Sequence, residues 1–232
     1  MASNFKASTR RQATIQAKAP RRRSIGRPAA DAESIGREGL IETTCQLLRE
    51  LPPNLITRAE VARRANVDPS LIRYYFNDRS SLLEAATERI TAAFSRSLAK
   101  AAASRGVTAE ARVRARVNAI FDLIGEYPFF QRLFVEELSD SPSHAGDKLL
   151  RKMVLEAIGD LRSVVNEGVR AGELKTTNLP FLFASMLGLA EFAATGGTVL
   201  NMATQGKLDQ ATAARRYRTY VGDMLVGGLR AG

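Results

Sequence analysis

One stretch, residues 57–83, constrains the fold of this chain more than any other, because helix start and stop signals follow one another closely there. Thr57 is a good N-cap, since its hydroxyl accepts a hydrogen bond from a free backbone N–H, and Glu60 completes the pattern of a capping box. Asn66 tolerates the left-handed conformation in which helices often end. Asp68, with a proline after it, suits the start of a second helix. The stretch therefore predicts two short helices joined by a tight turn.

The second of these short helices has an apolar side and an unusual polar side. Ile72 and Phe76 are four residues apart and are expected to face inward. Ser70, Arg73 and Tyr74 fall on the other side, so a cation and a phenol would face solvent. A short helix that carries such side chains and is held at an angle by a preceding helix fits the major groove of DNA. An ordinary helical hairpin is the alternative at this point, because such hairpins are common.

This stretch resembles the recognition segment of the TetR family of bacterial transcriptional regulators. The matching parts are the cap, the first helix, the turn, the recognition helix, the following basic residue and a leucine pair: Thr57, Val61-Ala62, Asn66-Val67-Asp68, Ile72 to Phe76, Arg79 and Leu82-Leu83. Two residues depart from the pattern, because Asn66 replaces the usual glycine and Arg73 stands where tyrosine is common. The resemblance implies an all-α chain with an N-terminal three-helix helix-turn-helix domain and a C-terminal helical domain for ligand binding and dimerisation.

The residues predicted to contact DNA lie in and around the second short helix. Arg73 is predicted to bond a guanine base, with a phosphate contact as the alternative. Tyr74 and Tyr75 are expected to position the DNA backbone or to pack on thymine methyl groups. The predicted phosphate contacts come from hydroxyls and guanidinium groups near the helix starts: Thr57, Arg58, Ser70 and Arg79.

Basic charge is concentrated at the N-terminus. The chain has a net charge of +10, and residues 1–30 contain eight lysines and arginines and no acid. This composition predicts a disordered basic arm over residues 1–30 that suits contact with phosphates. Two readings stay open for it, minor-groove contact and non-specific affinity alone. We place a helix-turn-helix domain with a linking helix at residues 31–104 and a helical effector-binding and dimerisation domain at residues 105–232.

The rest of the chain also indicates helices, because apolar residues recur at the helical period and no strand-like alternation occurs. Asp31 or Ser34 is expected to cap a first helix that ends near Arg49. Further helices are expected over 77–101, 109–126, 129–138, 141–170, 178–204 and 208–230. The stretch 178–204 is almost continuously apolar, but an internal glutamate, an asparagine and a glycine pair weigh against a membrane span.

The family resemblance implies that the last two helices form a dimeric four-helix bundle, so that a twofold protein binds a palindromic site. It also implies a small-molecule pocket in the C-terminal part. The proposed lining residues are Phe129, Phe130, Phe134, Met153, Phe183, Met186 and Phe192, and the proposed polar anchors are Arg132, His144, Glu191 or Asn201. The alternative is an ordinary core, because aromatic and methionine stripes at helical spacing usually belong to one.

The sequence contains no pattern typical of an enzyme or a metal site. Cys45 and His144 are the single residues of their kinds and fall in different predicted domains, and no HExxH, CxxC or glycine-rich phosphate loop is present. We therefore expect no enzyme activity, no metal and no cofactor. The single cysteine indicates a reducing compartment and the N-terminus lacks the apolar run of a secretory signal, so a cytoplasmic location is expected.

These patterns support three functional hypotheses. The first is a ligand-responsive, homodimeric DNA-binding transcriptional regulator without a membrane segment, released from a palindromic operator by a small molecule. The family resemblance favours repression over activation for it. The second is a ligand-independent dimeric DNA-binding regulator, and the third is a helical interaction module without a nucleic-acid role.

Overall fold

A computed structural model describes residues 35–102, 107–133 and 145–231, and residues 35–232 form one compact unit. The elements in order are α1 (Arg37–Glu50), η1 (Pro53–Leu55), α2 (Arg58–Ala65), α3 (Pro69–Tyr75), α4 (Arg79–Ala102), α5 (Ala109–Glu126), α6 (Phe130–Arg132), α7 (Ala145–Arg170), α8 (Leu179–Thr195), α9 (Gly197–Ala203) and α10 (Gln210–Leu229). The described residues include no strand, only one isolated β-bridge between Leu174 and Arg230. The predicted all-α fold class is therefore confirmed, and the arm predicted over residues 1–30 lies outside the described residues.

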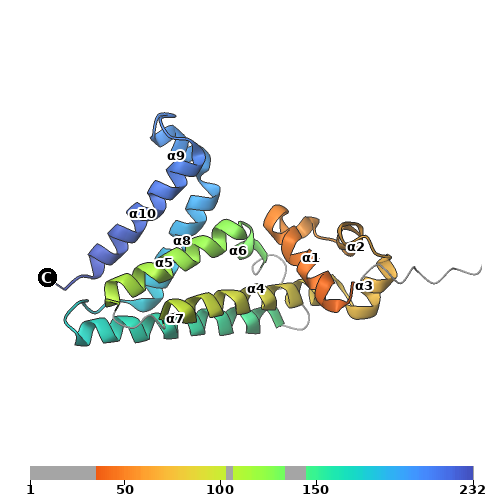
Figure 1. Cartoon of the computed structure of the whole chain (residues 1–232), viewed down its shortest axis with the longest axis horizontal. Helices are drawn as coiled ribbons and strands as arrows, with labels where there is room; N and C mark the ends of the chain where they lie inside the picture. Colours follow the sequence, from red (N-terminus) through yellow and green to blue (C-terminus); the bar gives the residue numbers. More distant parts are fainter. Residues whose placement is uncertain (1–34, 103–106, 134–144, 232) are drawn as a thin grey trace, which may run out of the picture. The chain divides into compact units, whose positions relative to one another are not determined.

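Helices α1 to α4, coloured orange to yellow in Figure 1, share the N-terminal core. Helix α1 packs against α2 and α4, and α2 packs against α3. Ala62 and Ala65 are both buried in α2, and such small side chains let a neighbouring helix approach closely. The largest fully buried side chains here are Leu40, Leu47, Ile56, Val61, Ile72, Leu82 and Leu83.

The start of α2 confirms one half of the predicted capping box. The Thr57 hydroxyl accepts a hydrogen bond from the Glu60 backbone N–H at 3.1 Å. The other half was predicted wrongly, because the Thr57 N–H donates to the Leu55 carbonyl and the Glu60 carboxylate accepts from Arg63. A guanidinium one helical turn away offers that carboxylate a charge-assisted bond, which is stronger than a bond to a neutral N–H.

The start of α1 also differs from the prediction. Gly36 is the N-cap, with extended backbone and no side-chain cap bond, so the expected capping by Asp31 or Ser34 is wrong. Both of those residues lie outside the described part of the chain. The end of α1 is as expected, since Leu51 is extended and the prolines that follow form the short turn η1.

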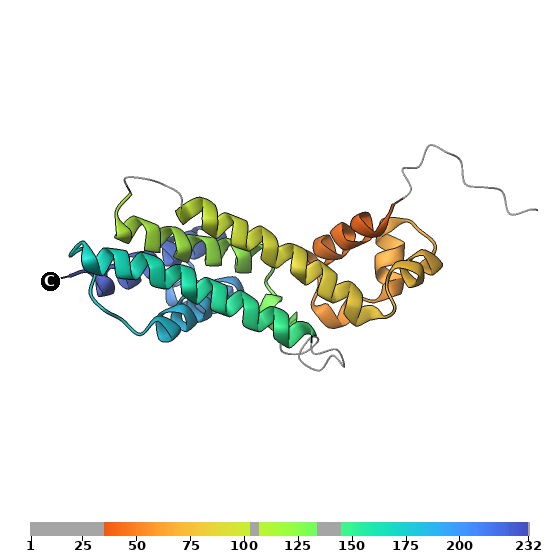
Figure 2. The same ribbon diagram turned by 90° about the horizontal axis from the view of Figure 1, so that it is seen from below.

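The C-terminal part is built around α5, which begins and ends where the sequence predicted. It contacts α4, α7, α8 and α10, and Figure 2 shows α4, α5 and α7 running side by side. Its apolar face buries Val113, Val117, Ile120 and Ile124, and burial of each such side chain contributes about 1.5–3 kcal/mol. Of the helices predicted over 129–138 and 141–170, the described portions are α6 and α7.

The apolar stretch 178–204 forms two helices, which corrects the prediction of one. Helices α8 and α9 meet at Gly196 with a bend of 81°. A Cβ at Gly196 would lie 2.5 Å from the Phe192 carbonyl oxygen, so only glycine fits this turn without a shift of the backbone. Among the described residues no single helix is long and apolar enough to cross a membrane, although α8 and α9 taken together meet both criteria by length and composition.

Candidate nucleic-acid interface and effector cavity

The turn between α2 and α3 sets the direction of α3. Asn66 adopts the left-handed conformation, with φ 53° and ψ 46°, as predicted. The N–H of Val67 then donates back to the Ala62 carbonyl at 3.0 Å, which satisfies the end of α2. The Asp68 carboxylate accepts from the Ser70 N–H at 2.7 Å and starts α3. The chain thus reverses within three residues, in the predicted geometry of a helix-turn-helix.

Helix α3 has the two faces that its sequence predicts. Ile72 and Phe76 are buried and hold the helix against the N-terminal core. Ser70, Arg73 and Tyr74 are exposed, and the Tyr74 side chain is 80% exposed. The placement of these five side chains is confirmed, whereas their contacts with DNA stay a prediction.

The remaining predicted DNA contacts differ in how exposed they are. Thr57 is exposed, whereas Arg58 is half-buried and donates to the Asn77 carbonyl in the α3–α4 turn at 3.3 Å. Tyr75 is also half-buried, and its ring lies edge-on to that of Tyr74 with the ring centroids 4.9 Å apart. The Arg79 guanidinium donates to the Ile56 carbonyl at 2.7 Å and to the Pro53 carbonyl. Arg79 therefore ties the segment before α2 to the start of α4, a role that the sequence did not reveal.

Charge on the α2–α3 surface is unevenly compensated. Arg63 pairs with Glu60 and Arg64 pairs with Glu50, each at 2.6 Å, and both guanidinium groups lower the pKa of their partner carboxylates. Such surface pairs contribute little stability, but they compensate the charges of these two arginines. Arg73, by contrast, forms no ion pair with the residues that the structure describes. Its positive charge on the exposed face of α3 suits contact with DNA.

An apolar cavity of about 220 Å³, partly open to solvent, lies among α4, α5, α6, α7 and α8. Its lining residues are Phe94, Ile120, Leu123, Phe130, Gln131, Leu150, Met153, Val154, Phe183 and Leu187. Three of the predicted lining residues, Phe130, Met153 and Phe183, meet there. The apolar lining is typical of a small-molecule site, and the volume lies somewhat below the usual range of about 300–1,000 Å³.

The other predicted lining residues are not brought to this cavity. Phe129 is half-exposed with the Arg132 guanidinium over its ring, and Met186 is buried beside a small void next to Arg116. Phe192 packs against a tyrosine of α10 with ring centroids 5.5 Å apart. Phe134 lies outside the described residues. The sequence pattern could not show which other helix each of these side chains would meet.

Among the predicted polar anchors, Glu191 lies beside the cavity. The side-chain amide of Gln131, a cavity residue, faces both carboxylate oxygens of Glu191. We assign its NH₂ group to this side, because the amide then donates to the carboxylate, whereas the opposite orientation would set oxygen against oxygen. Burial raises the pKa of the Glu191 carboxyl group. Asn201 lies on α9 and donates to a backbone carbonyl at 3.4 Å, and His144 lies outside the described residues.

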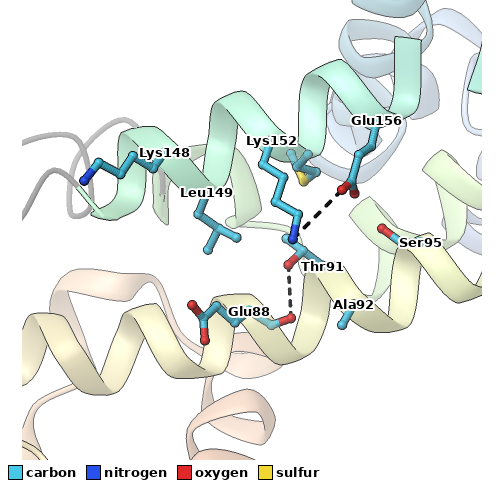
Figure 3. A pocket seen from close by; sticks show the side chains of 9 residues that line it. Glu88, Thr91, Ala92, Ser95, Lys148, Leu149, Lys152 and Glu156 are labelled. Atoms are coloured by element: carbon cyan, nitrogen blue, oxygen red, sulfur yellow. Dashed lines mark hydrogen bonds and ion pairs between the residues drawn. The ribbon is translucent and has the colours of Figure 1, made fainter. Parts of the chain in front are cut away.

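A polar groove of about 640 Å³ runs between α4 and α7 (Figure 3). Glu88 lies on its α4 side, and Lys148, Lys152 and Glu156 lie on its α7 side. The Lys152 side chain points toward α4 and pairs with Glu156 at 4.0 Å. Met153 lines both this groove and the apolar cavity, so the two spaces adjoin.

A buried ion pair close to the cavity was not predicted. The Arg116 side chain is 3% exposed and donates to both Asp160 oxygens, at 2.6 and 2.8 Å. A third bond goes to the Arg112 carbonyl at 2.8 Å. One sequence signal could have indicated it, because Arg116 lies between Val113 and Ile120 on the apolar face of α5.

Residues 110–225, half of the chain, match the family described as tetracyclin repressor-like, C-terminal domain. The chain belongs to the TetR family. It is 36% identical over 100 residues to the HTH-type transcriptional regulator BetI of Cronobacter sakazakii, which covers 41% of this chain and 48% of that protein. This TetR-family chain spans about half the length of the curated relatives it matches.

Solved structures with the same fold include other regulators. A TetR/AcrR-family transcriptional regulator from Thermobifida fusca superposes with a TM-score of 0.59 at 21% identity, covering 83% of this chain and 97% of that one. The transcriptional regulator FadR from Bacillus subtilis, solved in complex with stearoyl-CoA, superposes with a TM-score of 0.56 at 16% identity, covering 82% and 97%. At such identities these likenesses support the TetR fold of the chain and no shared ligand.

Proposed function

We propose that this TetR-family protein is a homodimeric DNA-binding transcriptional regulator that reads its operator through α3. The observation that carries the proposal is the outer face of α3. It displays Arg73 and the exposed Tyr74, while Ile72 on the opposite face anchors the helix in the core. The relatives named as HTH-type transcriptional regulators support the same function. We place the DNA-binding domain at residues 31–104 and the ligand-binding and dimerisation domain at residues 105–232.

The proposed contacts divide into base reading and backbone positioning. Arg73 bonds a guanine edge in the major groove, and a good bidentate contact of this kind discriminates between bases by about 1–3 kcal/mol. Tyr74 and Tyr75 pack on the DNA backbone or on thymine methyl groups. The phosphate contacts are Thr57, Arg58, Ser70 and Arg79, of which Arg79 also holds the α2 start in position.

The second copy is proposed to dock on α8 and α10, where apolar side chains are exposed. Phe181 on α8 is 72% exposed and Tyr220 on α10 is 63% exposed. Gly188, Gly227 and Gly228 have no atoms within 4 Å of the position of an added Cβ, so the helix backbones there are open to close approach. An exposed apolar face with such small residues is typical of a helix–helix interface between subunits. Two copies joined in this way suit a palindromic operator.

The cavity is proposed to hold a small-molecule effector that releases the operator. Helix α4 supports this, because it packs on α1 in the N-terminal part and on α5 and α7 in the C-terminal part (Figure 2). Its Phe94 also lines the cavity. An effector that binds one position of α4 more tightly than another would shift the separation of the two α3 helices. We propose repression that the effector relieves.

DNA binding is tested with duplexes selected by the protein from a random pool. Wild-type protein is expected to enrich a palindrome, and Arg73→Ala is expected to weaken binding by tenfold or more and to relax the base preference at one position per half-site. Arg162→Ala, which removes the same charge from an exposed position on α7, is the matched control and should bind normally. A wild-type protein without sequence preference, or an Arg73→Ala variant that binds normally, would contradict the proposal.

Effector binding is tested separately by thermal shift with a panel of metabolites. A compound that stabilises the protein and also weakens operator binding supports the effector role. If every stabilising compound leaves operator binding unchanged, the C-terminal part serves dimerisation alone and the regulator is ligand-independent.

A further inference from the structure

We infer that the apolar cavity selects a small apolar molecule with a cationic, hydrogen-bond-donating head, such as a primary amine, and that Glu191 is the counter-ion of this head. The inference rests on the proposed function, because it assigns a chemical class to the proposed effector. It is carried by the size of the cavity, the position of Glu191 beside it and the charges around both.

The size of the cavity suits a compact molecule. Its volume is about 220 Å³ and nine of its ten lining residues are apolar. An apolar protein cavity of about 150 Å³ can hold benzene, so this one has room for a single ring with a short arm. The only polar side chain in the lining is Gln131, so a polar head group is expected to lie at that side.

Helical spacing brings Glu191 to the same side. Phe183 and Leu187 line the cavity, and Glu191 follows them at the next i+4 position of α8. It therefore lies on the same stripe of the helix, about 6 Å further along the axis. The Gln131 amide, which lines the cavity, faces the Glu191 carboxylate and donates to it in the assigned orientation. A ligand head that displaces this amide reaches the carboxylate directly.

The charge of Glu191 is not compensated within the described part of the chain. No lysine or arginine there forms an ion pair with it. Two other half-buried carboxylates of the C-terminal part do have such a partner, since Asp160 pairs with Arg116 and Glu167 pairs with Arg112. Its partner, Gln131, is neutral. A partly buried carboxylate without a cation costs free energy, and a ligand cation would remove that cost.

The groove between α4 and α7 has no preference for an anion that would match the preference of Glu191 for a cation. Its charged lining residues are two lysines and two glutamates, Lys148, Lys152, Glu88 and Glu156, so their charges balance. Lys152 already pairs with Glu156 across one helical turn. Thr91 lies opposite and its hydroxyl donates to the Glu88 carbonyl (Figure 3). The groove therefore has no net charge that would select an anionic head group.

The test measures binding of three probes of matched shape to the full-length protein by calorimetry, without DNA. The probes are 2-phenylethylamine, 2-phenylethanol and phenylacetate. The amine is expected to bind at least tenfold more tightly than the alcohol, and phenylacetate is expected to bind more weakly than either. Glu191→Gln should lower the affinity for the amine to that for the alcohol, and Glu38→Gln, an exposed carboxylate in the N-terminal part, is the matched control.

A pH series separates a counter-ion from a residue that only supports the fold. Amine affinity in the wild type should fall as the pH drops through the raised pKa of Glu191, because protonation removes the counter-ion. The affinity of the Glu191→Gln variant for the amine should not change over the same range. Its circular dichroism spectrum should match that of the wild type.

Two results would overturn the inference. One is an amine that binds no more tightly than the alcohol or phenylacetate, and the other is an unchanged amine affinity in Glu191→Gln. Operator binding is then measured apart from ligand binding. An amine that binds through Glu191 but leaves operator affinity unchanged supports the ligand class and contradicts the effector role. Operator release by an anion, unaffected by Glu191→Gln, supports the effector role and overturns the ligand class.

Discussion

The N-terminal part, residues 35–102, and the C-terminal part, residues 107–231, are held together by different kinds of contact. The contacts that orient α3 join residues close together in the sequence, whereas those that pack the C-terminal helices join residues far apart. The turn that aims α3 depends on Asn66 and on the bond from Ser70 to Asp68, all within five residues. The packing of the C-terminal helices depends on pairs of residues 44 to 100 apart, such as Arg116 with Asp160 and Arg218 with Asn118. Local geometry can be predicted from neighbouring residues, whereas these pairings depend on which helices meet.

The two parts also differ in how their ion pairs contribute. The pairs on α2 are exposed, so water and salt screen them. In the C-terminal part Arg116 is buried, and its charge depends on a single carboxylate. Removing one partner should therefore have very different consequences in the two settings.

The largest expected effect is that of Asp160→Ala. It leaves the Arg116 guanidinium buried without a counter-ion, which should lower the free energy of unfolding by about 3 kcal/mol. Urea unfolding followed by circular dichroism measures the change. Asp122→Ala is the matched control, because this side chain is 67% exposed and its pair with Arg218 should contribute less than about 1 kcal/mol. If both variants lose the same free energy of unfolding, burial does not decide how much an ion pair contributes, and the prediction is wrong.

A smaller effect is expected at the α2–α3 turn. Asn66→Ala forces a residue with a Cβ and no local polar contact into the left-handed conformation, at a cost of about 1 kcal/mol. Asn66→Gly should leave the stability unchanged or raise it, because glycine adopts positive φ freely. Urea unfolding of both variants measures the difference. If alanine and glycine are equivalent there, the turn does not depend on backbone preference and the local account of the N-terminal part is wrong.

The smallest effect is the pH dependence of the α3 cap. Hydrogen bonds from Ser70 lower the pKa of Asp68, so its contribution to stability is complete above the ordinary aspartate pKa and is lost as the pH falls through the lowered pKa. The window lies below about pH 4. Asp68→Asn keeps a capping residue that does not titrate. Thermal midpoints of both proteins between neutral pH and pH 2 should diverge only in this window, and divergence near neutrality would contradict the assignment.

The sequence alone determined the features that depend on local energies. The caps at Thr57 and Asp68, the left-handed Asn66 and the two faces of α3 followed from residue type and helical spacing, as did both ends of α5. The errors arose where two local signals competed. The Glu60 carboxylate bonded Arg63 instead of closing the capping box, and the apolar pattern of 178–204 concealed the bend at Gly196.

Only the tertiary structure decided which side chains share a site. It placed Phe130, Met153 and Phe183 in one cavity and brought Gln131 next to Glu191, sixty residues away. It also gave Arg79 its bonds to the segment before α2. Helical periodicity shows which side of a helix is buried but not which other helix covers it. Pairings across large sequence distances depend on the packing of the whole unit, and no local pattern encodes them.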